Sequence, residues 1–187
     1  MRIILIVVTI FLSFTCLSQT KWHPDVGLHV SMDAEGYYVG PSLQVGINYR
    51  LKKRFGISSY LQYFPKRVEK TYSDGTFENG RYKSLVASLL FETNFFRTNN
   101  KGLILAGGLA LHSTTDNFTS TFDELHEKRT IIVGAIRIGY SLPMKNRSIS
   151  FELNAVGPYI GKTGPPPYFE QLIEILTQLS LGARLIF

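Results

Sequence analysis

The chain has 187 residues, enough for a single domain, and combines 44% hydrophobic residues with only 18% charged residues. About a quarter of the residues of a soluble domain are usually charged, so this balance is unusual for one. The net charge is +6, but lysine and arginine occur singly or in short turns, without a basic stripe or a known motif. This pattern argues against nucleic-acid binding.

The N-terminal segment has the organisation of a signal peptide. Arg2 precedes an apolar run, 3–12, and small and polar residues follow it. We predict a cleavable signal peptide at 1–19 and one mature domain at 20–187. The apolar run is too short to cross a bilayer as a helix, which takes about 20 residues. The single cysteine, Cys16, lies in this segment, and the bulky phenylalanine two residues before it disfavours a lipid anchor.

From residue 26 onward, apolar and polar residues alternate with a period of two, which predicts β-strands. Eight such runs occupy residues 26–32, 42–51, 55–63, 84–95, 103–112, 132–142, 148–155 and 174–187. Short basic turns at 52–54, 98–101 and 144–147 alternate with longer loops at 66–81, 113–128 and 157–171 and a brief loop near 33–36. We therefore predict an all-β, eight-stranded, antiparallel up-and-down barrel.

The alternation alone leaves open which face of the barrel is outside. A soluble, lipocalin-like barrel would bury its apolar face. Here the polar face consists mainly of Gly, Ser, Asn and Gln, whereas strands that face water are usually rich in Lys, Glu and Thr. The apolar face is nearly free of charge over about nine to eleven residues per strand, the length that a tilted strand needs to cross a bilayer. These features favour a transmembrane barrel with a crowded polar lumen.

Aromatic residues gather at both ends of the predicted strands, as membrane interfaces favour. Five lie beside the short turns: Tyr49, Phe55, Phe95, Tyr140 and Phe187. Five others lie beside the longer loops: Tyr37, Tyr38, Tyr63, Phe64 and Tyr82. Outer-membrane barrels have short turns on the periplasmic side, so we predict that both termini are periplasmic and that the longer loops are extracellular.

The last strand carries the most specific signal. Residues 179–187 alternate apolar and other side chains and end in Phe187. This segment resembles the terminal strand of bacterial outer-membrane barrels, and the whole chain resembles the small OmpA/OmpX-type, porin-like barrel family. The resemblance implies the outer membrane of a Gram-negative-type bacterium, contact with outer-membrane lipid, and recognition by the barrel-assembly machinery. It includes no catalytic motif and implies function only by analogy.

Charged residues on the predicted lumen face are the main candidate site. They are Arg50, Glu92, Arg137, Glu152 and Arg184, with Glu174 as a further partner. Two roles are open for them: a gated polar pathway, or an ion-pair network that closes the lumen. Charges away from bulk water need partners, and eight strands leave barely enough room for the side chains, so the closed network is favoured.

Two other groups of residues, those around His112 and those in segment 71–80, do not match the pattern of a lipid hydrolase or of a calcium site, respectively. Some eight-stranded barrels are lipid A deacylases with a Ser–His–acid set near the external rim. In that family the serine lies two positions after the histidine, but His112 is followed by Ser113 and then Thr114. The acidic segment 71–80 lacks the spacing of a calcium loop. We predict no catalytic residue, no metal site and no cofactor.

The leading functional prediction is a non-enzymatic outer-membrane protein with a structural or surface-interaction role. The three longer loops, at 66–81, 113–128 and 157–171, would make the contacts. The sequence does not identify the extracellular partner. The alternatives are a narrow porin-like channel for small or amphipathic solutes and, with less support, a lipid A-modifying hydrolase.

Overall fold

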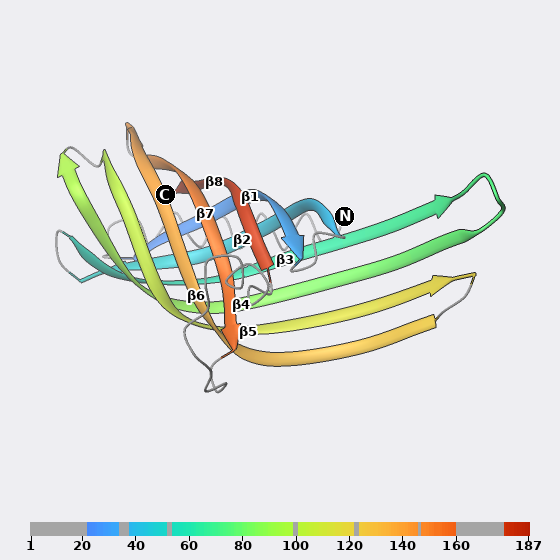
Figure 1. The fold of residues 1–187 in the computed structure, drawn as a ribbon. Coiled ribbons are helices and arrows are strands. Elements are labelled where there is room, and N and C mark those ends of the chain that lie inside the picture. Colours follow the sequence, from blue (N-terminus) through green and yellow to red (C-terminus); the bar gives the residue numbers. More distant parts are fainter. Residues whose placement is uncertain are drawn as a thin grey trace, which may run out of the picture.

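The structure, a computed structural model, describes residues 22–33, 38–51, 54–98, 101–121, 124–145, 147–159 and 178–187. Its strands are β1 (Trp22–Asp33), β2 (Val39–Arg50), β3 (Phe55–Thr71), β4 (Phe77–Thr98), β5 (Lys101–Ser120), β6 (Glu124–Met144), β7 (Arg147–Tyr159) and β8 (Gln178–Ile186). Each strand pairs antiparallel with the next, and β8 pairs with β1, so the sheet closes into a barrel (Figure 1). The predicted eight-stranded up-and-down fold is confirmed. The predicted signal peptide lies outside the described residues.

Neighbouring residues of each strand point to opposite sides of the barrel wall, because successive side chains of a β-strand alternate. On β3, Gln62 is fully buried while Leu61 and Tyr63 are exposed. At the closing seam, Val30 of β1 lies opposite Leu181 of β8, and both side chains are exposed. The period-two pattern of the sequence therefore separates the lumen from the outer surface.

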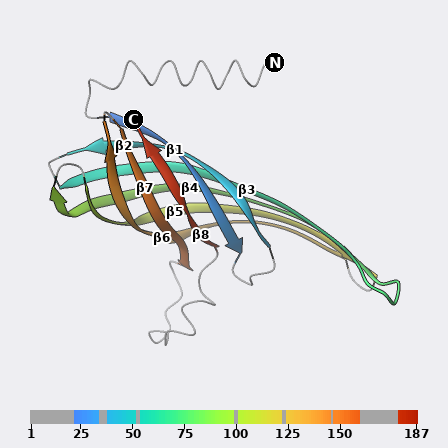
Figure 2. The same ribbon diagram turned by 90° about the horizontal axis from the view of Figure 1, so that it is seen from above.

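Four consecutive strands are much longer than the others. β3 to β6 have 17, 22, 20 and 21 residues, whereas β1, β2, β7 and β8 have 12, 12, 13 and 9. The extra length extends to one side of the barrel as a protruding sheet, which Figures 1 and 2 show from two directions. We call this the sheet end of the barrel. The opposite end, where β2 meets β3, β4 meets β5 and β6 meets β7, is the short-turn end.

The protruding sheet corrects two predicted loops. The sequence predicts loops at 66–81 and 113–128, but β3 continues to Thr71 and β5 continues to Ser120 before their hairpins turn. Both faces of this sheet lie outside the barrel, so the apolar–polar alternation that marks a half-buried strand fades there. The sequence marks only the turn that joins β3 to β4, where Asp74 is a typical turn residue. Its carboxylate accepts a hydrogen bond from the Thr76 backbone N–H at 2.9 Å. The third predicted loop, 157–171, lies mostly outside the described residues.

The lumen contains both apolar and polar side chains. One apolar cluster comes from β3 to β7 and consists of Tyr60, Val86, Leu90, Ala106, Ala110, Val133, Ala135 and Val156. All eight strands also contribute buried polar residues: Asp25, His29, Ser31, Ser42, Gln44, Ser58, Gln62, Ser84, Ser88, His112, Arg137, Ser141, Ser150, Glu152, Asn154, Gln178, Ser180 and Arg184. The lumen is therefore less uniformly polar than the sequence predicts, because the apolar cluster fills part of it.

The outer surface of the barrel is a continuous apolar belt. All eight strands contribute exposed large hydrophobic side chains, among them Leu28, Val45, Leu61, Leu89, Leu109, Ile136, Phe151 and Leu181. Monomeric soluble proteins rarely expose an apolar patch larger than a few hundred Å². A polar lumen inside an apolar outer surface is the polarity of a transmembrane barrel and the inverse of a lipocalin.

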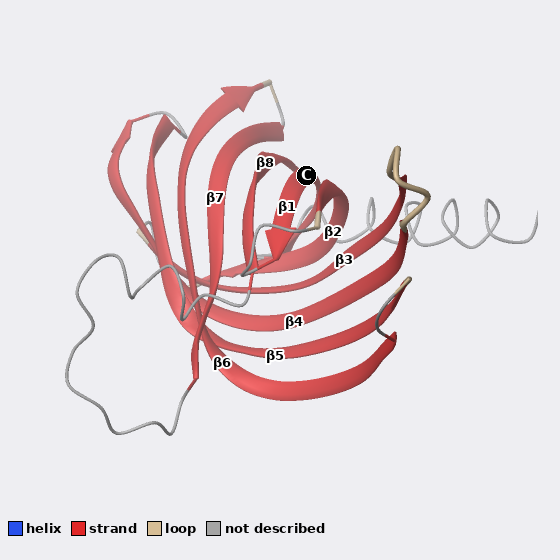
Figure 3. Ribbon diagram, turned by 45° about the vertical axis from the view of Figure 1, so that its right-hand side comes forward, coloured by secondary structure: helices blue, strands red, loops and turns tan. Residues whose placement is uncertain are grey.

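Every element of the described residues is a strand or a connection between strands (Figure 3). Within this part of the chain, no helix is long and apolar enough to span a membrane.

Gly182 allows β8 to approach β1 closely. A Cβ atom at this position would collide with the Leu28 carbonyl oxygen and with His29, whereas a Cβ at Gly107 would meet nothing within 4 Å. We expect Gly182→Val to lower the free energy of unfolding by about 1–3 kcal/mol, because backbone atoms cannot move aside cheaply. Urea unfolding in lipid vesicles measures this, with Gly107→Val as the matched control. Equal stability of the two variants would mean that the β1–β8 seam is not closed as described.

Candidate functional site

The centre of the lumen holds a compact ion-pair cluster. Glu152 on β7 lies between the guanidinium groups of Arg137 on β6 and Arg184 on β8, and all three side chains are fully buried. The Arg184 Nε donates to Glu152 Oε1 at 2.5 Å, and the Arg137 Nε lies 3.2 Å from Glu152 Oε2. Glu92 on β4 adds a second carboxylate, with Oε2 3.7 Å from Arg184 Nη2 and 3.8 Å from Arg137 Nη1.

Asp25 is a member of this cluster that the sequence analysis missed. Its Oδ2 lies 3.3 Å from Arg184 Nη1 and accepts a hydrogen bond of 2.5 Å from Asn48 Nδ2. The first strand was predicted to begin at residue 26, whereas β1 begins at Trp22. Asp25 lies four residues before His29, so it has the parity of the lumen face. Extending the period-two pattern by one residue towards the N-terminus would have found it.

Arg137 also contacts groups other than the carboxylates. Its Nε donates to Asn154 Oδ1 at 3.0 Å, and its Nη1 donates to Ser58 Oγ at 3.2 Å. Its guanidinium lies over the Tyr60 ring, 4.7 Å from the centroid, in a cation–π contact. The cluster therefore bridges the lumen from β6 and β7 to β3, and it occupies the cross-section where a solute would pass.

The structure brings four of the five predicted lumen charges together. Arg50 is different: it lies at the last position of β2, and its side chain is exposed at the short-turn end. Arg50 and Glu92 both line the recess at that end of the barrel. Glu174, the sixth candidate, lies outside the described residues.

Above the cluster, the lumen is filled by further layers, which follow one another along β3 towards the sheet end. The Gln62 Nε2, which carries two hydrogens, lies within hydrogen-bonding distance of three hydroxyl oxygens, those of Ser31, Ser42 and Ser180, at 3.1, 2.9 and 3.0 Å. Two residues later Phe64 is fully buried against Tyr82, with ring centroids 5.7 Å apart. These layers leave little space in an eight-stranded barrel, whose interior is just wide enough for side chains.

An aromatic cap closes the lumen at the sheet end. Tyr38 stacks on Tyr82 with ring centroids 4.8 Å apart, and its hydroxyl donates to Asp116 Oδ1 at 2.9 Å. Tyr38, Phe64 and Tyr82 were predicted to form an outward aromatic belt with Tyr63, and this prediction is wrong for the three buried residues. Tyr63 and Phe64 are adjacent on β3, so they cannot face the same side. Tyr37, the fifth predicted member, lies outside the described residues.

The aromatic residues predicted for the short-turn end lie at that end. Phe55, Phe95 and Tyr140 are exposed on the outer surface. Tyr49 packs against Trp22, with ring centroids 4.5 Å apart, and the Arg147 guanidinium lies 4.8 Å above the Phe187 ring.

The residues considered for lipid hydrolysis do not assemble into a catalytic set. His112 is buried, and its Nε2 lies 2.8 Å from Ser84 Oγ. Ser84 donates its hydroxyl proton to Gln178 Oε1, so it accepts a hydrogen bond from His112 instead of donating one, which is the reverse of an activated serine. Ser113 points away from His112 to the outer face, where its Oγ lies 3.0 Å from Thr130 Oγ1.

No protein-family model matches the chain, and no curated protein sequence matches it. Its structure is similar to that of Neisserial surface protein A, with 16% identity and a TM-score of 0.49, over 88% of this chain and 94% of that one. It is also similar to Ail, the attachment invasion locus protein of Yersinia pestis, in complex with the heparin analogue sucrose octasulfate. For Ail the identity is 17% and the TM-score 0.49, over 89% of this chain and 97% of that one.

A third similar structure is CarO of Acinetobacter baumannii, with 14% identity and a TM-score of 0.45, over 87% of this chain and 95% of that one. Similarities this distant carry no argument about function. The strand pairing and the reversed polarity of the chain itself decide the fold. The architecture is that of a small transmembrane barrel.

Proposed function

We propose that this chain is an integral outer-membrane protein that carries no solute and acts at the cell surface through its protruding sheet. Both termini would lie in the periplasm, because the described ends of β1 and β8 are at the short-turn end. The barrel-assembly machinery would recognise β8 during insertion, and outer-membrane lipid would cover the apolar belt.

The filled lumen is the observation that carries this proposal. The middle of the barrel is occupied by Arg137, Arg184 and Glu152, which are 0–1% exposed. Between this cluster and the sheet end lie the Gln62 layer and the aromatic cap. A solute could pass only if this charged cluster separated. Leaving one partner of a buried ion pair without the other costs about 3–5 kcal/mol, so a state in which these charges separate without new partners would be rare.

The protruding sheet supports the surface role. The pairing of β2 with β3 ends at Leu43 and Tyr63, and that of β6 with β7 ends at Val133 and Tyr159. Beyond those points, among the described residues, the outer edges of β3 and β6 have no neighbouring strand. Pro65 and a run of charged residues on β3 discourage nonspecific strand pairing. The described part of the sheet therefore offers two broad faces and two strand edges above the barrel, and the β3 edge is protected in this way.

Planar-bilayer conductance tests the absence of a pathway. We expect no reproducible open state from the purified barrel under conditions in which a known porin conducts. A stable conductance that disappears when Arg50 is replaced by a bulkier aromatic residue would instead support the narrow channel. Mass spectrometry of lipid A tests the hydrolase alternative. If lipid A from cells that express the protein carried fewer acyl chains than lipid A from cells without it, an enzyme would be supported.

A further inference from the structure

The short-turn end of the barrel contains a recess of about 180 Å³. A water molecule occupies about 30 Å³ in the liquid, so the recess has room for a ligand group of several heavy atoms. Glu92 lines it and also faces the buried Arg137 and Arg184. The recess therefore reaches the ion-pair cluster from the short-turn end.

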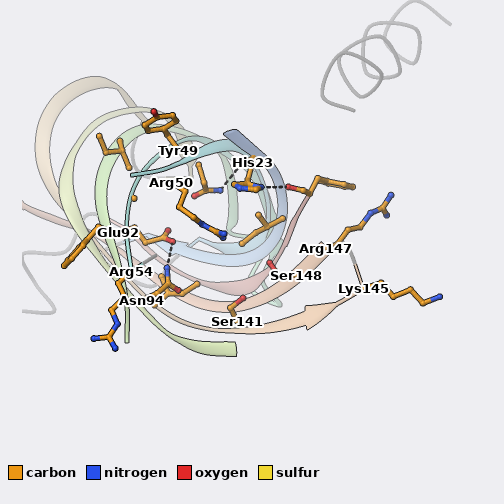
Figure 4. Close-up of a pocket in the computed structure, with 17 residues that line it drawn as sticks. His23, Tyr49, Arg50, Arg54, Glu92, Asn94, Ser141, Lys145, Arg147 and Ser148 are labelled. Carbon is orange, nitrogen blue, oxygen red and sulfur yellow. Dashed lines mark hydrogen bonds between the residues drawn. The ribbon is translucent and has the colours of Figure 1, made fainter. Parts of the chain in front are cut away.

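Positive charge dominates the walls of this recess. Arg50, Arg54, Lys145 and Arg147 line it, against Glu92 as the one acidic side chain among the described lining residues. Figure 4 shows Arg50 directed into the mouth, whereas the side chains of Arg54, Lys145 and Arg147 start at the rim and point outwards. An anion entering here meets one guanidinium inside the mouth and a positive field at the entrance.

The negative charge of Glu92 is already engaged. Its Oε2 faces two guanidinium groups, and its Oε1 accepts a hydrogen bond of 3.3 Å from Asn94 Nδ2. The Arg147 guanidinium is stacked on the Phe187 ring, which restrains its plane and leaves its N–H edges available to a ligand. Restrained, planar donors suit a multi-oxygen anion better than mobile side chains do.

The remaining walls suit a group at the membrane surface. Neutral hydrogen-bonding side chains, such as those of Asn48 and Ser148, lie beside apolar ones, such as those of Phe55 and Ile57. Phe55 and Ile57 are also exposed on the outer face of the barrel wall, next to the aromatic residues of the short-turn end. The recess thus lies where phospholipid headgroups border a membrane barrel.

We infer that this recess binds a phosphate group, presented by the headgroup of an anionic phospholipid or by a soluble phosphate ester. A phosphate offers at least three acceptor oxygens, enough to meet Arg50 and a rim cation together with a neutral donor such as the Ser148 hydroxyl. The binding concerns the end of the barrel opposite the protruding sheet, so it is independent of the proposed surface role.

Two binding measurements on the full barrel distinguish the sources of the phosphate. In neutral detergent, glycerol 3-phosphate is titrated by calorimetry. In nanodiscs that contain phosphatidylcholine alone or with phosphatidylglycerol, native mass spectrometry counts the retained anionic lipids. Binding in the titration identifies a soluble ester as sufficient, whereas retention of phosphatidylglycerol without binding in the titration identifies the lipid headgroup. Either result supports the recess only if it depends on the lining cations.

Charge-removing variants test that dependence. We expect Arg50→Gln to weaken binding about tenfold, as the loss of one charge-assisted hydrogen bond does, and Arg50→Gln with Arg147→Gln to weaken it further. Lys70→Gln removes a charge at the far end of β3 and should leave binding unchanged. Heat-modifiable migration on gels confirms that each variant is folded. Absence of binding in both measurements, or equal binding by the recess variants and Lys70→Gln, would overturn the inference.

Discussion

Replacing Glu152 by alanine is expected to lower the free energy of unfolding by about 3–5 kcal/mol, as breaking a buried ion pair does. The change removes the carboxylate between Arg137 and Arg184, whose side chains are 0% exposed. Both guanidinium groups would remain buried, with Glu92 near 3.7–3.8 Å and Asp25 at 3.3 Å as their remaining acidic neighbours. Urea unfolding in lipid vesicles, followed by the fluorescence of Trp22, measures the loss.

The exposed ion pair between Arg67 and Glu69 on the protruding sheet is the control for this prediction. Glu69→Ala should change the free energy of unfolding by less than about 1 kcal/mol, because water screens an exposed pair. Glu152→Gln separates charge from shape, since the amide fills the same space without the negative charge. If Glu152→Ala were as mild as Glu69→Ala, the centre of the lumen would have to be hydrated.

Leu89→Arg is the second substitution with a large expected effect. Leu89 lies in the middle of the apolar belt on β4, opposite Leu109 of β5, and is 59% exposed on the outer surface. An arginine on the lipid face of a membrane barrel costs about 2–4 kcal/mol at the bilayer midplane. We expect a loss of stability in this range, measured by unfolding in vesicles.

Thr71→Arg, an exposed position at the tip end of β3, is the matched control. It should be nearly neutral, because that position meets water in the proposed orientation. A soluble barrel would tolerate both changes, since an exposed leucine that becomes arginine in water loses nothing. Equal stability of the two variants would therefore contradict a membrane-embedded belt.

The strands of the barrel wall could be predicted because one of their faces is apolar throughout. Leu85, Leu89 and Phe91 on β4 mark that face as clearly in the sequence as in the structure. The extensions of β3 to β6 could not be predicted in the same way, because neither face of the protruding sheet is uniformly apolar. Residues 66–71 and 113–120 therefore read as polar loops although they are paired strands.

The candidate site could be predicted as a set of residues but not as a geometry. The alternation places Glu92, Arg137, Glu152 and Arg184 on the lumen face. Their contacts depend on the register, which pairs Glu152 with Gly182 and Arg137 with Asn154. A shift of one residue would move each charge to the other face. Arg50 also lies on the lumen side of the period-two pattern, but it is the last residue of β2. The alternation says which face a side chain is on, and it does not say how far the residue lies from the end of the barrel.

Cysteine labelling in intact cells tests the central claim, that this chain is an outer-membrane barrel with its protruding sheet outside. Cys16 is the only cysteine and lies in the predicted signal peptide, so a new cysteine in the mature chain has no background. Ser73→Cys places a thiol at the tip of the sheet, and Lys101→Cys places one at the short-turn end, both at exposed positions. We predict that a membrane-impermeant maleimide labels Ser73→Cys in intact cells, and Lys101→Cys only after the outer membrane is permeabilised. Labelling of Lys101→Cys in intact cells, or recovery of both variants in the soluble fraction, would contradict the account.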